Sequence, residues 1–262
     1  FKNHQKHPTG YETINEYMAR DYVVPKDFED YAYVSQLLQA RGMKIAIEAH
    51  RRAKSYCMGT LYWQFNDCWP VTSWSSLDYY GNWKAFHYQA KRSFENLLLS
   101  VNEENEIYKV FLVNDNFESY SVRLELELLS FDGKSLWENS KEVTVKENTS
   151  INVYEIPKDE FEKFDLKSSV LKVNWEEVKI NYFFAKPKDL KLQKPNIEIK
   201  IINDFMIEIS SDVLAKDVFL SSENEVFFED NYFDLLPNDK RIIKLSKAAK
   251  EIKVKSLFDT IK

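Results

Sequence analysis

The spacing of apolar residues changes along the chain, from a helical period near the N-terminus to alternation farther on. Apolar side chains three and four positions apart at 11–22 predict a short helix that ends before Pro25. The same spacing at 28–54 predicts one long helix, or two helices separated at Gly42. Basic residues at 50–52 suit the negative end of its dipole. The N-terminal part is therefore predicted to be mainly helical.

A run dense in apolar and aromatic residues follows at 57–65. Such a run predicts a strand that is buried on both faces, as in parallel sheets. A polar, aromatic stretch at 66–82 predicts a long loop, and helical spacing resumes at 83–99. The order helix, buried strand, long loop, helix indicates part of an α/β structure.

Beyond residue 100, apolar and polar residues alternate in short runs, which predicts antiparallel strands. The predicted strands are 107–113, 122–128, 143–146, 151–154, 170–173, 180–184, 197–201, 206–210, 213–220, 226–228, 242–245 and 252–257. A turn is predicted at 131–134, where Asp-Gly accepts positive φ. A Lys-rich connector at 187–195 divides the strands into two sets. We therefore expect β-sandwiches at 99–188 and 189–262, after an N-terminal unit at 1–98.

Composition excludes several classes of protein. With 44% hydrophobic and 30% charged residues, the chain is typical of a globular protein. Its net charge of -6 offers no basic surface for a nucleic acid, and no apolar run reaches the roughly 20 residues that a membrane span needs. Cys57 and Cys68, the two cysteines, are expected to be buried thiols and suggest no metal site. Neither a nucleic-acid partner nor a membrane span is expected.

Candidate chemistry is concentrated at 57–87, where aromatic rings mix with amides and carboxylates. Aromatic faces suit the apolar face of a sugar ring and polar groups bind its hydroxyls, so the mixture is typical of a carbohydrate site. Tyr62, Trp74 and Phe86 are expected in the core. Trp63 and the loop after it are expected to contact a ligand instead, because barrels of parallel strands place their active sites at the C-terminal ends of those strands. They are the candidate site.

The stretch Met58 to Phe94, MGTLYWQFNDCWPVTSWSSLDYYGNWKAFHYQAKRSF, closely resembles the eighth strand, following loop and final helix of β-mannosidases in glycoside hydrolase family two. HQKHPTG at 4–10 and segments beginning at Tyr182 and Asn231 are similar to the same proteins. The resemblance implies that 1–98 is the end of a (β/α)₈ barrel, followed by two immunoglobulin-like β-sandwich domains.

The same resemblance implies part of a retaining exo-β-mannosidase that releases terminal β-D-mannose from mannosides or oligosaccharides, with no cofactor and no metal. Retention needs two carboxyl groups roughly 5–5.5 Å apart. The family's nucleophile motif, Glu-Phe-Gly, is absent, and the four Asn-Glu pairs lie in a helix or in or near sandwich turns. Those pairs are at 15–16, 102–103, 105–106 and 224–225. Both catalytic glutamates are therefore expected upstream of Phe1, and this chain alone is expected to be inactive.

The residues that match the family by position support the sugar pocket. Trp63 is expected to form the pocket floor or wall. Asp67 is expected either to bind a sugar hydroxyl or to orient a neighbour, or else to close the strand as an Asx turn together with Asn66. Trp69 is expected at the entrance or as a loop anchor. His50 and His87 are expected to pack rather than to act as ligands or bases.

Two alternatives stay open. Asn82-Trp83-Lys84 has the Asn-x-Lys form that β-glucuronidases use on the uronate carboxylate, so a β-glucuronidase or β-galactosidase of the same family is the first. The second is a carbohydrate-binding or interaction module at 99–262 that uses Trp137, Trp175, Phe227 and Phe228, although core positions suit these rings better. If the family assignment holds, the protein is periplasmic or secreted in a bacterium, or lysosomal in an animal. Oligomeric state is left open.

Overall fold

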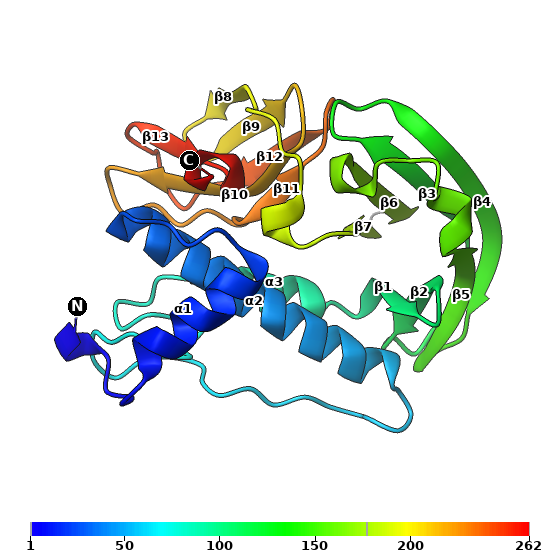
Figure 1. Ribbon diagram of the computed structural model, residues 1–262, viewed down its shortest axis with the longest axis horizontal. Coiled ribbons are helices and arrows are strands. Elements are labelled where there is room, and N and C mark those ends of the chain that lie inside the picture. The colour runs from blue at the N-terminus through cyan, green and yellow to red at the C-terminus, as the bar shows by residue number, and fades with distance from the viewer. Residues whose placement is uncertain (1, 177, 262) are drawn as a thin grey trace.

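The computed structural model describes residues 2–176 and 178–261, and Phe1 lies outside them. The helices form one layer, and two β-sandwiches lie next to it, one at the end of the long helix and one along the helices (Figure 1). The helices are α1 (Gly10–Asp21), α2 (Phe28–Arg52) and α3 (Ala85–Ser93), with short 3-10 turns η1 to η5 at Lys2–His4, Lys158–Phe161, Leu166–Ser168, Pro187–Asp189 and Leu257–Thr260. No helix in the described part of the chain is long and apolar enough to cross a membrane.

The two N-terminal helices confirm the prediction from apolar spacing. α1 ends at Asp21, before Pro25, and α2 runs without a break through Gly42. Asp27 caps α2, because its side chain accepts a hydrogen bond from the backbone N–H of Asp30 at 2.9 Å. His50, Arg51 and Arg52 occupy the last turn, where positive charge is favourable. Local signals therefore set both ends of this helix.

Antiparallel pairing builds both sandwiches. The first packs the sheet β1-β2-β5 against β4-β3-β6-β7, and the second packs β12-β9-β8 against β11-β10-β13. The strands are β1 (Leu97–Glu104), β2 (Ile107–Asn114), β3 (Tyr120–Ser130), β4 (Ser135–Val145), β5 (Thr149–Pro157), β6 (Ser169–Trp175), β7 (Val178–Phe183), β8 (Ile197–Asn203), β9 (Met206–Ser211), β10 (Ala215–Ser222), β11 (Phe233–Leu235), β12 (Lys240–Lys244) and β13 (Ile252–Lys255). The predicted Asp-Gly turn joins β3 and β4, with Gly133 at φ 88°. The predicted all-β half is confirmed, although the domain boundaries near residues 98 and 188 stay predictions.

Each sandwich has its own apolar core, and a third core joins the helices to the second sandwich. Trp175 is 1% exposed in the first core, and Phe228 is 3% exposed in the second. In the third, Phe86 of α3 and Tyr33 of α2 belong to the same cluster as Tyr232 of the second sandwich. The second sandwich is therefore fixed to the helices by buried apolar surface.

The strand predicted at 57–65 is not formed. The segment is extended but pairs with no strand in the described residues, and Leu61, Trp63 and Phe65 are 101%, 76% and 58% exposed. Figure 1 shows it as a long connection, without an arrow, that leads from the end of α2 back toward α1. A strand buried on both faces needs a neighbour along each edge and a layer on each face. The described residues cover one face, where Tyr62 packs on Phe86, and the apolar side chains of the other face stay exposed.

Two further assignments are corrected. The helix predicted at 83–99 ends at Ser93, and Leu97 already begins β1, because Leu97 to Glu104 pair with β2 along their full length. Consecutive leucines fit either a helix or a buried strand, so tertiary pairing decides between them. The strand predicted at 226–228 is reduced to one isolated bridge, between Phe228 and Leu245.

Candidate functional site

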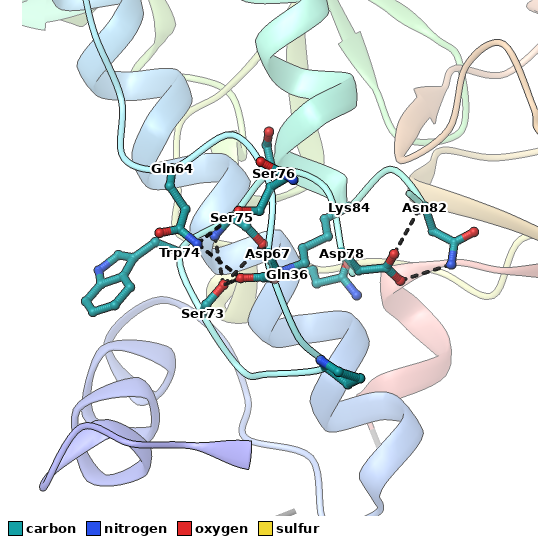
Figure 2. A network of polar contacts seen from close by, with 12 residues as sticks. Gln36, Gln64, Asp67, Ser73, Trp74, Ser75, Ser76, Asp78, Asn82 and Lys84 are labelled. Carbon is teal, nitrogen blue, oxygen red and sulfur yellow. Dashed lines mark hydrogen bonds and ion pairs between the residues drawn. The ribbon is translucent and has the colours of Figure 1, made fainter. Parts of the chain in front are cut away.

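The polar loop that follows the exposed segment is organised around one buried carboxylate, that of Asp67, which is 5% exposed. Its Oδ1 accepts hydrogen bonds from Gln64 Nε2 at 3.2 Å and from Ser73 Oγ at 2.6 Å. Its Oδ2 accepts from Ser75 Oγ and from Lys84 Nζ, the latter at 3.2 Å. Figure 2 shows these side chains converging on Asp67 from both ends of the loop. All four acceptor positions of the carboxylate are thus in use within the loop.

These contacts determine the charge of Asp67. Burial by itself would raise its pKa, but the hydrogen bonds from Ser73 and Ser75 and the charge of Lys84 outweigh burial, so the pKa of Asp67 lies below its ordinary value. Lys84 Nζ also donates to Ser75 Oγ at 2.5 Å. Asp67 is therefore an ionised group that holds the loop together, and it has no free oxygen for a ligand in this arrangement.

A second polar centre lies at Ser76 and joins the loop to α3. Ser76 Oγ donates to Phe65 O at 2.9 Å. The same Ser76 Oγ lies 3.1 Å from Tyr62 Oη and 2.9 Å from His87 Nδ1. Because the hydroxyl has one proton and gives it to Phe65, both Tyr62 and His87 must donate. Burial lowers the pKa of His87, so the ring is neutral at pH 7 with its proton on Nδ1. The His87 ring packs edge-on against Trp83 and Phe65, as predicted, and its hydrogen bond to Ser76 also links α3 to the loop.

The turn at 78–82 is also closed by its own polar groups. Asp78 Oδ1 accepts from the backbone N–H of Tyr80 at 2.8 Å and of Asn82 at 2.9 Å, and Asn82 Nδ2 donates to Asp78 Oδ2 at 2.9 Å. Figure 2 shows this pair beside the Asp67 centre. Asn82 and Lys84, the candidate uronate ligands, are thus both engaged inside the loop. Nothing in the geometry favours the β-glucuronidase alternative.

The four predicted site residues have different surroundings. Trp63 is 76% exposed and Asn66 is exposed, and both lie on the solvent side of the extended segment and its end. Asp67 is enclosed. Trp69 is 36% exposed, and one face of its ring stacks on His4 at 5.7 Å. The structure therefore presents Trp63, Asn66 and Trp69 to solvent and buries the one carboxylate among the four.

Three rings were predicted to be core, and one of these predictions is wrong. Phe86 is buried, and Tyr62 packs edge-on against it at 4.7 Å between ring centroids. Trp74 is instead 60% exposed. Its backbone oxygen accepts from Gln39 Nε2 of α2 at 2.6 Å, which fixes the main chain while the ring extends outward. Figure 2 shows this ring directed away from the Asp67 centre.

The partners of Asp67 were not predicted from the sequence. Ser73 and Ser75 are close to it in the chain, and a cluster of serines after a lone Asp was an available signal. The sequence suggests Lys84 only as a uronate ligand, through the Asn-x-Lys form. The contact of the N-terminal HQKHPTG segment was also missed: His4 Nδ1 lies 2.5 Å from Pro70 O, so this segment braces the loop next to Trp69.

The site is an open surface rather than a closed pocket. Two of the hollows in the described residues have volumes of about 220 and 410 Å³, and Trp63 lines neither of these two. The smaller lies between α3 and the second sandwich, beside Lys91 and Arg241, and the larger lies on the outer face of the β4-β3-β6-β7 sheet, beside Arg123 and Lys179. A sugar pocket at Trp63 would therefore need further walls. No cluster of potential metal ligands was found in the part of the chain described.

Most of the rings that a carbohydrate-binding or interaction module at 99–262 would use are engaged in packing. Trp175 and Phe228 are 1% and 3% exposed, and Trp137 packs edge-on against Phe161 at 5.2 Å while its Nε1 donates to Glu160 at 2.7 Å. Phe227 keeps 41% of its surface exposed. Three of the four rings therefore have core or packing roles, as the sequence favoured.

Family models match both sandwiches. Residues 106–189 match a Mannosidase Ig/CBM-like domain, and residues 192–260 match the Ig-fold domain of mannosidases. Together these models cover the all-β half and leave the helices and the polar loop to be compared by whole-chain similarity.

Whole-chain comparison gives relatives along nearly the entire sequence. The chain is 31% identical to the β-mannosidase of Capra hircus over 216 residues, which are 74% of this chain and 25% of the relative. It is 28% identical to β-mannosidase B of Thermothelomyces thermophilus, over 89% of this chain and 32% of the relative. The chain thus spans only about a quarter to a third of the relatives it matches.

Solved structures superimpose on nearly the whole of this chain. The β-D-mannosidase of Dictyoglomus thermophilum superimposes with a TM-score of 0.85 at 30% identity, over 95% of this chain and 32% of that protein. An exo-chitosanase of Amycolatopsis orientalis superimposes with a TM-score of 0.71 at 14% identity, over 94% of this chain and 37% of that protein, which shows a shared fold alone.

Proposed function

Because this chain belongs with the β-mannosidases of glycoside hydrolase family two, whose C-terminal portion it matches, we propose that it is part of a retaining exo-β-mannosidase. The whole protein would release terminal β-D-mannose from mannosides or oligosaccharides. Residues 1–98 would be the end of its (β/α)₈ barrel, and 99–188 and 189–262 its last two β-sandwich domains. The two catalytic glutamates would lie outside this chain, which would be inactive by itself.

One observation carries the proposal: an outward-facing aromatic ring stands on a loop whose own polar groups are satisfied. Trp63 is 76% exposed, although the loop after it is closed around the buried carboxylate of Asp67. Leu61 and Phe65 of the same segment are exposed as well, and several exposed apolar side chains together mark a surface that is covered by a ligand or by other parts of the protein. The apolar face of a pyranose, together with further barrel walls, is a chemically suitable cover.

In this proposal each site residue has its own task. Trp63 stacks on the sugar and excludes water around the oxocarbenium-like transition state. Asn66 offers an exposed amide to a sugar hydroxyl. Asp67 is a positioning residue, since its oxygens are occupied by the loop. Trp69, whose ring stacks on His4 and lies 5.5 Å from Lys6 Nζ, lines the entrance.

Substrate preference of the whole enzyme tests the proposal. Nitrophenyl β-mannoside, β-glucuronide and β-galactoside are offered separately, and kcat/KM is measured for each. We expect the mannoside to be the preferred substrate. Turnover of the glucuronide alone would overturn the proposal, and Asn82 and Lys84 would then have to leave their partners in the loop.

A further inference from the structure

The second sandwich reaches the candidate site through one aromatic ring, that of Phe227. Its backbone is held by the sandwich: the N–H of Phe227 donates to Ser246 Oγ at 3.0 Å, and the N–H of Ser246 donates to Phe227 O at 3.0 Å. The next residue, Phe228, points into the sandwich core and is 3% exposed. Phe227 is 41% exposed and lies outside that core, so its ring has another neighbour.

That neighbour is the end of the polar loop. The Phe227 ring lies edge-on to Trp83, with 5.0 Å between centroids, and parallel to Tyr88 of α3 at 6.4 Å. Tyr88 Oη donates to Phe228 O at 3.1 Å, and this hydrogen bond links α3 to the second sandwich next to Phe227. Edge-on and offset-parallel rings at these separations attract each other beyond their simple burial. The contact is thus a specific one between the sandwich and the loop.

A chain of contacts continues from Trp83 to the segment that carries Trp63. Trp83 packs edge-on against His87 at 4.3 Å, and His87 Nδ1 donates to Ser76 Oγ at 2.9 Å. Ser76 Oγ in turn donates to the backbone oxygen of Phe65 at 2.9 Å. The backbone N–H groups of Ser76 and Leu77 also donate to Phe65 O, at 3.2 and 2.9 Å, so the segment that carries Trp63 is attached to the loop at Ser76.

We propose that Phe227 is a positioning residue for the candidate sugar site: it fixes Trp83 and, through His87 and Ser76, the placement of Trp63. The second sandwich then acts as a brace of the active site from outside the barrel. The proposal rests on the proposed function for its catalytic consequence, but not for its structural one.

The test uses the whole protein with Phe227→Ala and, as a milder change that keeps apolar volume, Phe227→Leu. Phe205→Ala is the matched control, because Phe205 is 58% exposed on the same sandwich. Hydrogen exchange of peptides covering 57–67 and kcat/KM on nitrophenyl β-mannoside are measured for each. For Phe227→Ala we expect exchange at 57–67 to speed up several-fold and kcat/KM to fall roughly ten-fold, since misplaced groups lose rate steeply. Phe227→Leu should show a smaller change in the same direction, and Phe205→Ala none.

Unchanged exchange at 57–67 in a folded Phe227→Leu or Phe227→Ala protein would overturn the inference. If Phe227→Ala does not fold, Phe227→Leu decides. If the unmodified protein hydrolyses no β-mannoside, the proposed function fails, while the exchange measurement still decides whether Phe227 holds the segment. Equal effects in Phe205→Ala would mean a general loosening of the sandwich and would also count against the inference.

Discussion

Lys84 and Asp67 form a buried ion pair across the candidate loop, with Nζ 3.2 Å from Oδ2 and side chains 16% and 1% exposed. The pair ties Asp67, two residues after the predicted strand at 57–65, to Lys84, the residue before α3 and seventeen positions later. Such pairs add little net stability compared with apolar residues, but removing one partner leaves a charge unpaired and is costly. The integrity of the loop should therefore depend strongly on either partner.

Asp67→Asn should lower the free energy of unfolding by about 3 kcal/mol, because Lys84 loses its counter-charge inside the loop. Urea denaturation of the variant and the unmodified protein measures this. Asp204→Asn, at an exposed position, is the control and should change stability by less than about 0.5 kcal/mol. A value for Asp67→Asn as small as that of the control would show that the Asp67 centre does not hold the loop.

His87 should make stability depend on pH. Burial lowers its folded-state pKa below the ordinary value, so the unfolded chain takes up the proton first as the solution is acidified. The contribution of His87 is therefore fully present above about pH 6.5 and is lost as pH falls through the folded pKa. The free energy of unfolding, measured from pH 7.5 to 5, should fall toward acid.

His87→Gln should flatten that slope, because Gln cannot titrate yet can still donate a hydrogen bond toward Ser76. His50→Gln is the matched control: His50 is exposed and lies 3.0 Å from Thr60 Oγ1. An equal slope in His87→Gln and in the unmodified protein would place the pH dependence elsewhere.

Much of the architecture follows from periodicity. α1, α2 and most strands were predictable because each buries its own apolar face, which a short window of sequence records. The segment at 57–65 was not, because whether an apolar run is paired depends on elements distant in sequence. Leu97 to Leu99 show the same limit, since only pairing with β2 distinguishes strand from helix there.

The site was predictable in position but not in the division of tasks. The mixture of rings and polar groups indicated the region around Trp63, and the structure leaves that ring in solvent. Asp67 could not be assigned from sequence, because its role depends on Lys84, which folding brings to it from the far end of the loop. Local sequence gives no measure of such a contact.

Arg51 joins the long helix to the first sandwich and should be critical for stability. It is 9% exposed, and its guanidinium donates to Ser93 O at 2.6 Å and to Asp115 Oδ2 at 3.0 Å. Arg51→Ala removes these charged hydrogen bonds and leaves the carbonyl oxygen of the buried Ser93 without this donor, while the exposed Asp115 keeps its pair with Lys54, so we expect a loss of about 2 kcal/mol in urea denaturation. Arg20→Ala is the control, because the pair of Arg20 with Glu16 is largely exposed, and it should cost less than about 1 kcal/mol. Similar losses in both variants would contradict the buried junction.

Trp63→Ala separates a binding role from a structural one. Because the ring is 76% exposed, its removal should change the free energy of unfolding of this chain by no more than about 0.5 kcal/mol. In the whole enzyme the same change should lower kcat/KM on nitrophenyl β-mannoside roughly 100-fold, since stacking and water exclusion at the transition state are lost. Phe117→Ala, which removes a ring that is 92% exposed on the first sandwich, should leave both quantities unchanged. Full activity in Trp63→Ala would remove Trp63 from the sugar pocket and leave its exposure to be explained by contact with other parts of the protein.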